Sequence, residues 1–420
     1  MKNKKVWVIS AASVAGIIVI VGIFTAYIFS RVNKYNLLVY PKIKVHGVEI
    51  GGESKEEAKK ILDEYFSNEI SKKVIKIKVG DKEYNLKSED VNVKVSIDDT
   101  VEEAYKYGKS GSVIDKYKNL KKEKEYPIKV TFDENKVNEY LSTIEKEVNK
   151  NATDATIELK DGQFITKSGS DGSKLNIDKL NKDVTEELSS DKFDGEVVVE
   201  AEVEEVKPTI KEEDLKTINT KISSFSTNFG TSVDGRVTNI KLATSAINGK
   251  VVMPGEEFSY NEVVGDTTAD RGYQKAGTYV GNKVVEGYGG GICQVSSTLY
   301  NAIMGANIRS TERLNHNMPV SYVGIGCDAT IAYGYIDYKF KNTLKHPIYI
   351  SGHTSGPILT FDIYGNESDY DPSTTYKVRG EKTGQRNGDK YTVNSYLDTY
   401  KDGALVDSEY ITTDTYRDHE

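Results

Sequence analysis

Residues 289–302 of this chain read Gly289-Gly290-Gly291-Ile292-Cys293-Gln294-Val295-Ser296-Ser297-Thr298-Leu299-Tyr300-Asn301-Ala302. Three consecutive glycines carry no side-chain bulk and reach positive φ freely, so they suit a close approach of the backbone to a ligand and end any preceding strand. Beyond them, apolar residues recur at helical spacing, at Val295, Leu299, Ala302, Ile303 and Ala306. The stretch therefore predicts a glycine-rich loop followed by a buried helix that begins at or just after Cys293.

This placement puts the Cys293 thiol at a helix N-terminus. The helix dipole and the unpaired N–H groups there favour the thiolate and lower its pKa, which would make Cys293 a competent nucleophile. The alternative from the residues alone is that Cys293 packs as a small buried hydrophobe, as many cysteines do. Ser296 and Ser297 are better interpreted as N-terminal helix caps than as nucleophiles.

The rest of the chain predicts an α+β fold. A chain of 420 residues exceeds what one hydrophobic core usually organises. Ser54 and Glu57 form a capping box before an apolar stripe, which predicts a helix of about three turns, and residues 74–79 alternate as a strand does. We expect α+β modules over residues 31–207, a mostly β domain with one buried helix over 222–365, and a β-rich tail of short strands over 366–420.

The N-terminal region predicts a membrane anchor. Residues 6–30 contain no charge and as a helix can span ~30 Å of hydrocarbon. Lysines in the preceding tail, residues 1–5, place that tail in the cytoplasm and the rest of the chain outside. A cleaved signal peptide would have a shorter apolar region, of ~7–15 residues, and a small-residue cleavage site. We therefore expect a single-pass cell-membrane protein whose C-terminal region is extracytoplasmic.

Charge and cysteine content exclude several classes of partner and site. The formal net charge of −8 argues against a nucleic-acid partner, which would call for a basic face. The absence of zinc-ligand spacing and of nucleotide-binding loops predicts no metal and no cofactor. The two cysteines, Cys293 and Cys327, either pair with each other or leave at least one free thiol.

Several motifs between Phe225 and about Phe361 resemble the VanW family. They are Arg236-Val237-Thr238-Asn239-Ile240, Asn248-Gly249, Pro254-Gly255-Glu256-Glu257-Phe258-Ser259, the run from Gly289 to Asn301, Glu312-Arg313 with His316, Asp328-Ala329-Thr330, and Asp337 with Phe340 to Asn342. Residues 36 to about 205 resemble, more diffusely, the peptidoglycan-binding modules that often precede VanW domains. The family was named from a glycopeptide-resistance cluster, and some members resemble L,D-transpeptidases that use the cysteine of the glycine-rich motif. The resemblance implies peptidoglycan stem peptides as substrate and Cys293 as nucleophile.

The second cysteine departs from the family, whose members usually carry another residue at the position of Cys327. A disulfide between the two cysteines would disarm Cys293. We expect instead that Cys327 is a reduced bystander, because Gly324-Ile325-Gly326 before it is typical of a flexible turn.

A cysteine nucleophile is helped by a base and by a group that orients the base. His316 lies inside the motif block and is our choice of base, since His346 and His353 are more typical of structural or exposed histidines. Asp328 and Asp337 are both candidates for the orienting carboxylate, and the sequence does not rank them. Four residues are expected to line the substrate site, Gly290, Gly291, Gln294 and Ser296.

Arg313 is a further candidate for the substrate site. A guanidinium can hold a substrate carboxylate through a bidentate contact. The alternative is an arginine that is exposed or ion-paired within the protein, and the sequence favours neither.

The function expected from these residues is acyl transfer on wall tetrapeptides through a Cys293 thioester, and the resemblance supplies the bond type and the amine acceptor. Hydrolysis would use the same residues. The alternative from a different class is a non-catalytic peptidoglycan-binding or envelope scaffold protein in which Cys293 only packs. The sequence does not indicate an oligomeric state.

Overall fold

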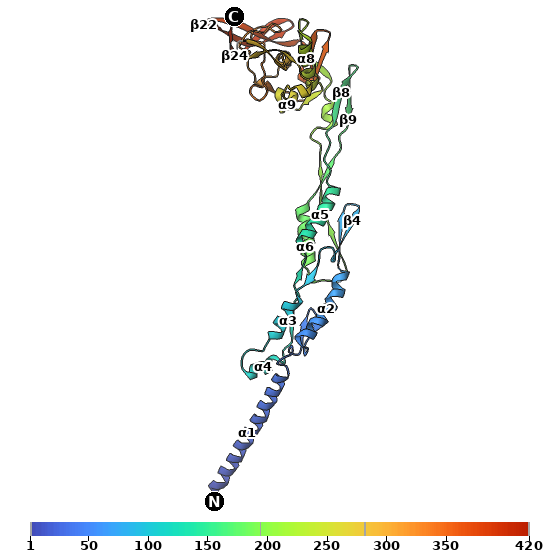
Figure 1. The fold of residues 1–420 in the computed structure, drawn as a ribbon, viewed down its shortest axis with the longest axis vertical. Helices are drawn as coiled ribbons and strands as arrows, with labels where there is room; N and C mark the ends of the chain where they lie inside the picture. The colour runs from blue at the N-terminus through green and yellow to red at the C-terminus, as the bar shows by residue number, and fades with distance from the viewer. Residues whose placement is uncertain (1, 194, 281–282, 419–420) are drawn as a thin grey trace. The chain divides into compact units, whose positions relative to one another are not determined.

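The computed structural model describes the backbone of residues 2–193, 195–280 and 283–418, and the side chains of 13–193, 195–278 and 285–418. It is a mixed α+β structure with one apolar N-terminal helix and many small sheets (Figure 1). The chain divides into an N-terminal unit, Met1–Ala152 with Asp171–Val206, and a C-terminal unit, Thr153–Ser170 with Lys207–Glu420.

The N-terminal unit has six helices and ten strands within its described residues. They are α1 (Lys2–Lys34), β1 (Ile43–Val45), β2 (Val48–Glu49), α2 (Lys55–Lys72), β3 (Val74–Val79), β4 (Lys82–Lys87), β5 (Lys94–Val95), α3 (Ile97–Lys106), α4 (Val113–Asn119), β6 (Lys124–Tyr126), β7 (Val130–Thr131), α5 (Glu134–Val148), β10 (Gly172–Leu175), α6 (Ile177–Ser189), β11 (Glu196–Glu200) and β12 (Val203–Val206). The strands form the sheets β2-β1-β6, β11-β3-β4, β5-β7 and β10-β12.

Helix α2 begins where the capping box predicts. The Ser54 hydroxyl accepts a hydrogen bond from the Glu57 N–H at 3.1 Å, which satisfies one of the free donors of the first turn. The helix has 18 residues and is therefore longer than the expected three turns, and it buries Ala58, Leu62 and Phe66. Strand β3 alternates between half-buried and buried residues as its sequence predicts.

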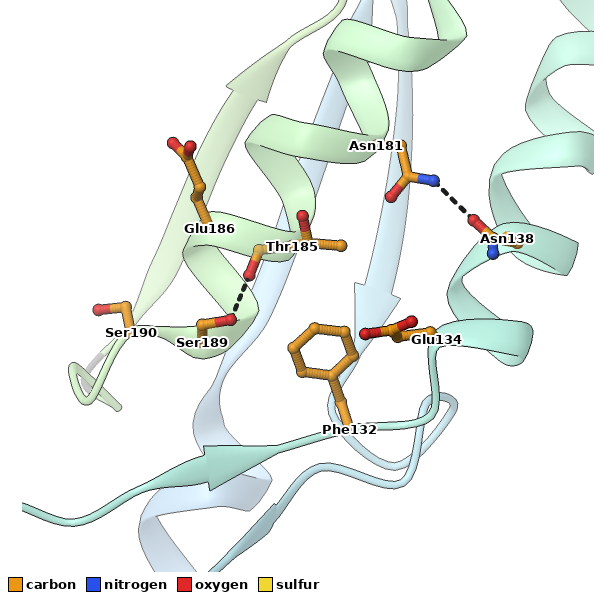
Figure 2. A pocket seen from close by; sticks show the side chains of 8 residues that line it. All are labelled: Phe132, Glu134, Asn138, Asn181, Thr185, Glu186, Ser189 and Ser190. Carbon is orange, nitrogen blue, oxygen red and sulfur yellow. Dashed lines mark hydrogen bonds between the residues drawn. The ribbon is translucent and has the colours of Figure 1, made fainter.

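A groove runs between α5 and α6 in the N-terminal unit and encloses about 630 Å³. Figure 2 shows Asn181 of α6 pointing across the groove to Asn138 of α5, and the Asn181 amide donates a hydrogen bond to the Asn138 oxygen at 2.6 Å. The ring of Phe132 and the carboxylate of Glu134 lie near the start of α5 (Figure 2). The other residues that line it are polar, Thr185, Glu186, Ser189 and Ser190.

The C-terminal unit contains the remaining elements. They are β8 (Thr156–Lys160), β9 (Gln163–Lys167), α7 (Glu212–Leu215), β13 (Thr220–Asn228), α8 (Asp234–Ile247), β14 (Lys250–Val252), β15 (Glu257–Ser259), α9 (Tyr260–Val264), η1 (Ala269–Arg271), β16 (Lys275–Val280), β17 (Lys283–Tyr288), α10 (Ile292–Gly305), β18 (Ser310–Glu312), β19 (Lys339–Lys341), β20 (Ile348–Ser355), β21 (Ile358–Gly365), η2 (Glu367–Asp369), β22 (Thr374–Asn387), β23 (Lys390–Lys401) and β24 (Ala404–Arg417). The strands form the sheets β13-β21-β20-β14, β15-β19-β18, β16-β17, β8-β9 and β22-β23-β24.

Helix α10 is the central helix of this unit. It packs against β13 and β21 of the four-stranded sheet, while α8 packs against β20. Val295, Leu299, Ala302 and Ile303 are fully buried, as their helical spacing predicts. The helix therefore fixes the position of Cys293 relative to the main core.

Two segments outside residues 222–365 also belong to this unit. The hairpin β8–β9 packs against α7 and β20, and the Leu159 N–H donates to the Tyr349 hydroxyl at 3.3 Å. The sheet β22-β23-β24 contributes Leu397 to the core around α10. Its strands are 14, 12 and 14 residues long, so the expectation of short strands in this region was wrong.

We expect Gly380→Ala to destabilise the C-terminal unit. A Cβ at Gly380 of β22 would lie 1.9 Å from the carbonyl oxygen of Ile325, a backbone atom that cannot move without shifting its loop. Overpacking of this kind costs about 1–3 kcal/mol of unfolding free energy. Gly324→Ala is the matched control, because its Cβ would make an ordinary contact of 3.6 Å with the Cys327 sulfur. Equal thermal unfolding midpoints for the two variants would contradict the packing of β22 on this loop.

Candidate functional site

A cleft of about 1020 Å³ lies in the C-terminal unit, and both Cys293 and His316 line it. Other lining residues come from β13, α8, α9, the β16–β17 hairpin and the loops after β18, and include Asn228, Arg236, Tyr260, Gly289, Gly291, Tyr322 and Thr330. The cleft is therefore built around the N-terminus of α10.

The glycine-rich loop turns sharply into α10. Gly289 has φ 79° and Gly291, the N-cap residue, has φ 106°, a region that other residues rarely adopt. A Cβ at Gly290 would lie 2.7 Å from the Gly277 carbonyl oxygen of β16. Gly290 is thus required for a close approach to protein backbone, and only Gly289 and Gly291 of the three line the cleft.

Two loops meet beside the first turn of α10. The Thr330 N–H donates to the Leu314 carbonyl at 2.8 Å, which brings the loop after β18 against the loop before β19. Ser296 donates to the Ala329 carbonyl at 2.6 Å, and Ser297 accepts the Ala329 N–H at 3.0 Å. The expectation that these serines cap the helix was wrong, because α10 begins at Ile292 and both hydroxyls join its interior to the second loop. Ser296 is also fully buried and does not line the cleft.

Cys293 is the second residue of α10 and is partly exposed. Its sulfur lies 3.8 Å from the Thr330 hydroxyl and 3.7 Å from the Ile331 carbonyl. Burial alone would raise the Cys293 pKa, but the hydrogen bond with His316 and the charge of that imidazolium hold it below its ordinary value. Cys293 therefore favours the thiolate more than an ordinary cysteine does.

His316 is buried, and both its backbone and its ring bond to one oxygen of Asp328. The backbone N–H and the ring Nδ1 each lie 2.6 Å from Asp328 Oδ2. Although burial alone would lower the His316 pKa, the hydrogen bonds with Asp328 and Cys293 raise it to about 9. The imidazole is consequently protonated at neutral pH and oriented with its Nδ1 toward the carboxylate.

The other oxygen of Asp328 is also bonded. The Tyr416 hydroxyl of β24 donates to Asp328 Oδ1 at 2.5 Å, and Arg313 lies 3.5 Å from the same oxygen. Burial raises the Asp328 pKa, but the His316 hydrogen bond and the Arg313 charge lower it below the usual value. Asp328 is therefore an ionised carboxylate inside the protein.

Of the two interpretations of Arg313, the structure supports an arginine that is ion-paired within the protein and not one that faces substrate. Its side chain is 5% exposed, and its Nη1 donates to both oxygens of Asp414 at 2.6 Å. Its Nε donates to the Asp328 carbonyl at 2.6 Å. The guanidinium is thus an internal counter-charge for two buried carboxylates.

Asp337 lies apart from His316. Its carboxylate accepts from the Ser259 hydroxyl at 2.5 Å and from the Asn261 N–H at 2.9 Å, which holds the junction of β15 and α9. Of the two candidate carboxylates, the structure brings only Asp328 to the histidine.

Gln294 lines the cleft, but its amide is bonded within the protein. Its Oε1 accepts from Arg236 at 2.8 Å and its Nε2 donates to the Thr227 hydroxyl at 2.9 Å. Arg236 in turn donates to the Ser232 hydroxyl at 2.6 Å. Gln294 therefore fixes a cation at the cleft wall, which the sequence analysis did not anticipate.

Asp414 and Tyr416 are the site residues that the sequence analysis missed. They lie on β24, and the Arg313–Asp414 contact joins residues 101 positions apart. No local motif surrounds them, so only the tertiary structure reveals their contact with Arg313 and Asp328.

Both cysteines are free thiols in the structure. Cys327 is buried, its thiol donates to the Val378 carbonyl at 3.4 Å, and burial raises its pKa to about 11. Within the described residues, no group of three or more His, Cys, Asp or Glu side chains is placed to hold a metal ion.

Comparison with known proteins gives two family matches. A family described as "VanW like protein" matches residues 235–364, and one described as "Putative peptidoglycan binding domain" matches residues 84–195. No solved structure gives a significant match.

Two curated proteins are similar to the chain. The uncharacterized protein YoaR of Bacillus subtilis is 39% identical over 161 residues, which cover 38% of this chain and 53% of that protein. The vancomycin B-type resistance protein VanW of Enterococcus faecalis is 33% identical over 114 residues, which cover 26% of this chain and 42% of that protein. The chain thus spans about half the length of the curated relatives it matches.

The matched segment contains Cys293, His316 and Asp328, whereas Asp414 and Tyr416 lie beyond it. The groove between α5 and α6 lies inside the other matched segment. The chain therefore carries a VanW-like domain and, ahead of it, a peptidoglycan-binding domain.

Proposed function

We propose that the chain is a cysteine acyltransferase of the L,D-transpeptidase type that acts on peptidoglycan stem peptides. The observation that carries this proposal is the pair Cys293 and His316 at the wall of an open cleft, with Asp328 buried behind the histidine, a lowered thiol pKa and a raised imidazole pKa. Such a thiolate–imidazolium pair is the resting state that nucleophilic cysteine chemistry requires.

In the first half-reaction, the Cys293 thiolate attacks the carbonyl carbon of the amide before the terminal D-residue. The dipole of α10 would stabilise the oxyanion, because its positive end lies at the turn that carries the sulfur. His316 then gives its proton to the leaving nitrogen as the C–N bond breaks. The terminal D-amino acid departs and the stem remains as a thioester on Cys293.

In the second half-reaction, the side-chain amine of a neighbouring stem attacks the thioester. His316, now neutral, accepts the proton of that amine, and the C–S bond breaks to regenerate the thiolate. Asp328 keeps the imidazole ring oriented through both steps, since its Oδ2 bonds to the ring and to the backbone of the same residue. Water in place of the amine would give hydrolysis with the same residues.

The cleft and the matched domains support a wall substrate. A volume of about 1020 Å³ is at the upper end of the range for ligand pockets, which leaves room for segments of two stems. The peptidoglycan-binding domain would hold the polymer whose stems enter the cleft. Activity on stem peptides is also consistent with a relative named for vancomycin resistance.

We further propose that α1 anchors the protein in the cell membrane as a single-pass helix with the rest of the chain outside. Within the described residues, Ser13–Lys34 is one helical stretch long and apolar enough to cross a membrane, with mean hydropathy 2.2. A peptidoglycan ligand calls for the same extracytoplasmic location.

The second candidate function is peptidoglycan binding without catalysis. The groove between α5 and α6 favours it, because hydroxyl and amide groups with one aromatic ring are the groups that bind sugars and peptides. The two candidates are distinguished by the Cys293 thiol, which only the first requires.

We expect Cys293→Ser to abolish release of the terminal D-amino acid from purified tetrapeptide muropeptides, measured by chromatography of the products. Loss of a nucleophile lowers kcat by about 10³-fold or more. Cys327→Ser is the matched control and should retain activity, since its thiol is buried and protonated. Undiminished product from Cys293→Ser would refute the covalent mechanism.

We expect Asp328→Asn to weaken the thiolate of Cys293. Removing the carboxylate lowers the His316 pKa from about 9 toward its ordinary value, so the imidazolium is lost at a lower pH and the Cys293 pKa rises. The pH profile of iodoacetamide alkylation at Cys293, followed by mass spectrometry, should move to higher pH.

Asp337→Asn is the control for that shift, because Asp337 bonds to Ser259 and Asn261 and not to the histidine. Its alkylation profile should match that of the unaltered protein. Identical profiles for Asp328→Asn and Asp337→Asn would show that the Asp328 contact does not affect the pKa of the Cys293 thiol.

We expect Asn181→Ala to weaken co-sedimentation of the protein with purified cell-wall sacculi. The substitution removes from the groove wall an amide to which the bound polymer would hydrogen-bond, and one lost hydrogen bond of about 1 kcal/mol corresponds to a roughly fivefold lower affinity. Asn68→Ala, an exposed amide on α2, is the control. Equal binding by both variants would exclude the groove as the wall-binding site.

A further inference from the structure

The last turns of α1 pack against other elements of the N-terminal unit. The ring of Tyr27 meets the ring of Tyr117 of α4 edge to face, with centroids 6.3 Å apart. Ile28 is 6% exposed, whereas the apolar residues before it, such as Phe24 at 58%, are open. Contact with the unit therefore begins before α1 ends.

The position of this contact fixes the depth of α4 if α1 spans a membrane. From Tyr27 to the end of α1 at Lys34 the helix rises only ~10 Å. The headgroup region on one side of a bilayer is ~5–8 Å thick, and tyrosines gather at that level. A helix packed on Tyr27 consequently lies in or beside the headgroups.

The composition of α4 and the residues after it suits that level. Ile114 is 58% exposed and has no place in the core of the unit. Residues 113–122 contain four lysines, Lys116, Lys118, Lys121 and Lys122, and one acidic residue, Asp115, whose carboxylate is engaged with Ser112 in a capping box. The acidic residue that follows, Glu123, is paired with Lys44 at 3.5 Å. We define Ile114 and these four lysines as the α4 patch.

We propose that the α4 patch is a membrane-contact site that binds the anionic phosphate headgroups of the outer leaflet and inserts Ile114 among them. The proposal rests on α1 being a retained membrane anchor. An exposed apolar residue beside several lysines is the pattern of an interfacial helix, and each lysine near an anionic surface adds to the attraction. The contact would hold the N-terminal unit at a fixed tilt beside its anchor.

The test uses the full chain in lipid nanodiscs and tryptophan quenching by brominated lipids. The sequence has one tryptophan, Trp7, in the apolar segment, so the unaltered chain reports on the anchor itself. In a Trp7→Phe background, Ile114→Trp places an indole on the α4 patch. Val198→Trp, at an exposed position of β11 in the same unit, is the matched control.

With nanodiscs of phosphatidylglycerol we expect brominated lipid to quench the tryptophan fluorescence of Ile114→Trp. The fluorescence of Val198→Trp should stay unquenched. Replacing the four lysines by glutamine should reduce the quenching, and so should replacing phosphatidylglycerol by phosphatidylcholine.

The outcomes separate the two proposals. Quenching of Trp7 without quenching at position 114 would overturn the membrane-contact site and leave the anchor intact. Absence of quenching at Trp7 would overturn the anchor and, with it, the α4 proposal.

Discussion

The site is organised by one buried carboxylate, that of Asp328. A carboxylate inside a protein is costly unless donors replace the water it has lost. Here the backbone and ring of His316 bond to one oxygen and the Tyr416 hydroxyl bonds to the other. These donors keep Asp328 ionised, and its negative charge holds a proton on His316. The resulting imidazolium stabilises the thiolate of Cys293. Each step depends on the one before it.

The same network explains why the C-terminal sheet is part of the site. Arg313 lies between Asp328 and Asp414, so it neutralises a carboxylate from the loop before β19 and another from β24. Removing β24 would take away Asp414 and Tyr416 together, leaving a buried guanidinium without its bidentate partner and Asp328 without the hydroxyl that donates to its Oδ1. The segment that matches the VanW family therefore does not contain every residue that supports its own cysteine and histidine.

The sequence predicted the features that depend on local pattern. Glycine spacing and apolar periodicity located α10, and with it the thiol at a helix start; the motif block identified His316. It did not choose between Asp328 and Asp337, because each follows a loop and the choice depends on the contact between Thr330 and Leu314. The sequence left the role of Arg313 open and misassigned the serines of α10 for a related reason: their partners, Asp414 and Ala329, are distant in sequence.

The two thiols show how strongly the local environment shifts the pKa of chemically identical groups. Cys327 has carbonyl oxygens as acceptors and no cation bonded to its sulfur, so burial dominates and the thiol stays protonated. Cys293 is also shielded, but His316 bonds to it and supplies a positive charge, which outweighs the cost of desolvation. Only the thiolate attacks electrophiles or disulfides. A thiolate is therefore favoured at Cys293, whereas burial keeps the Cys327 thiol protonated.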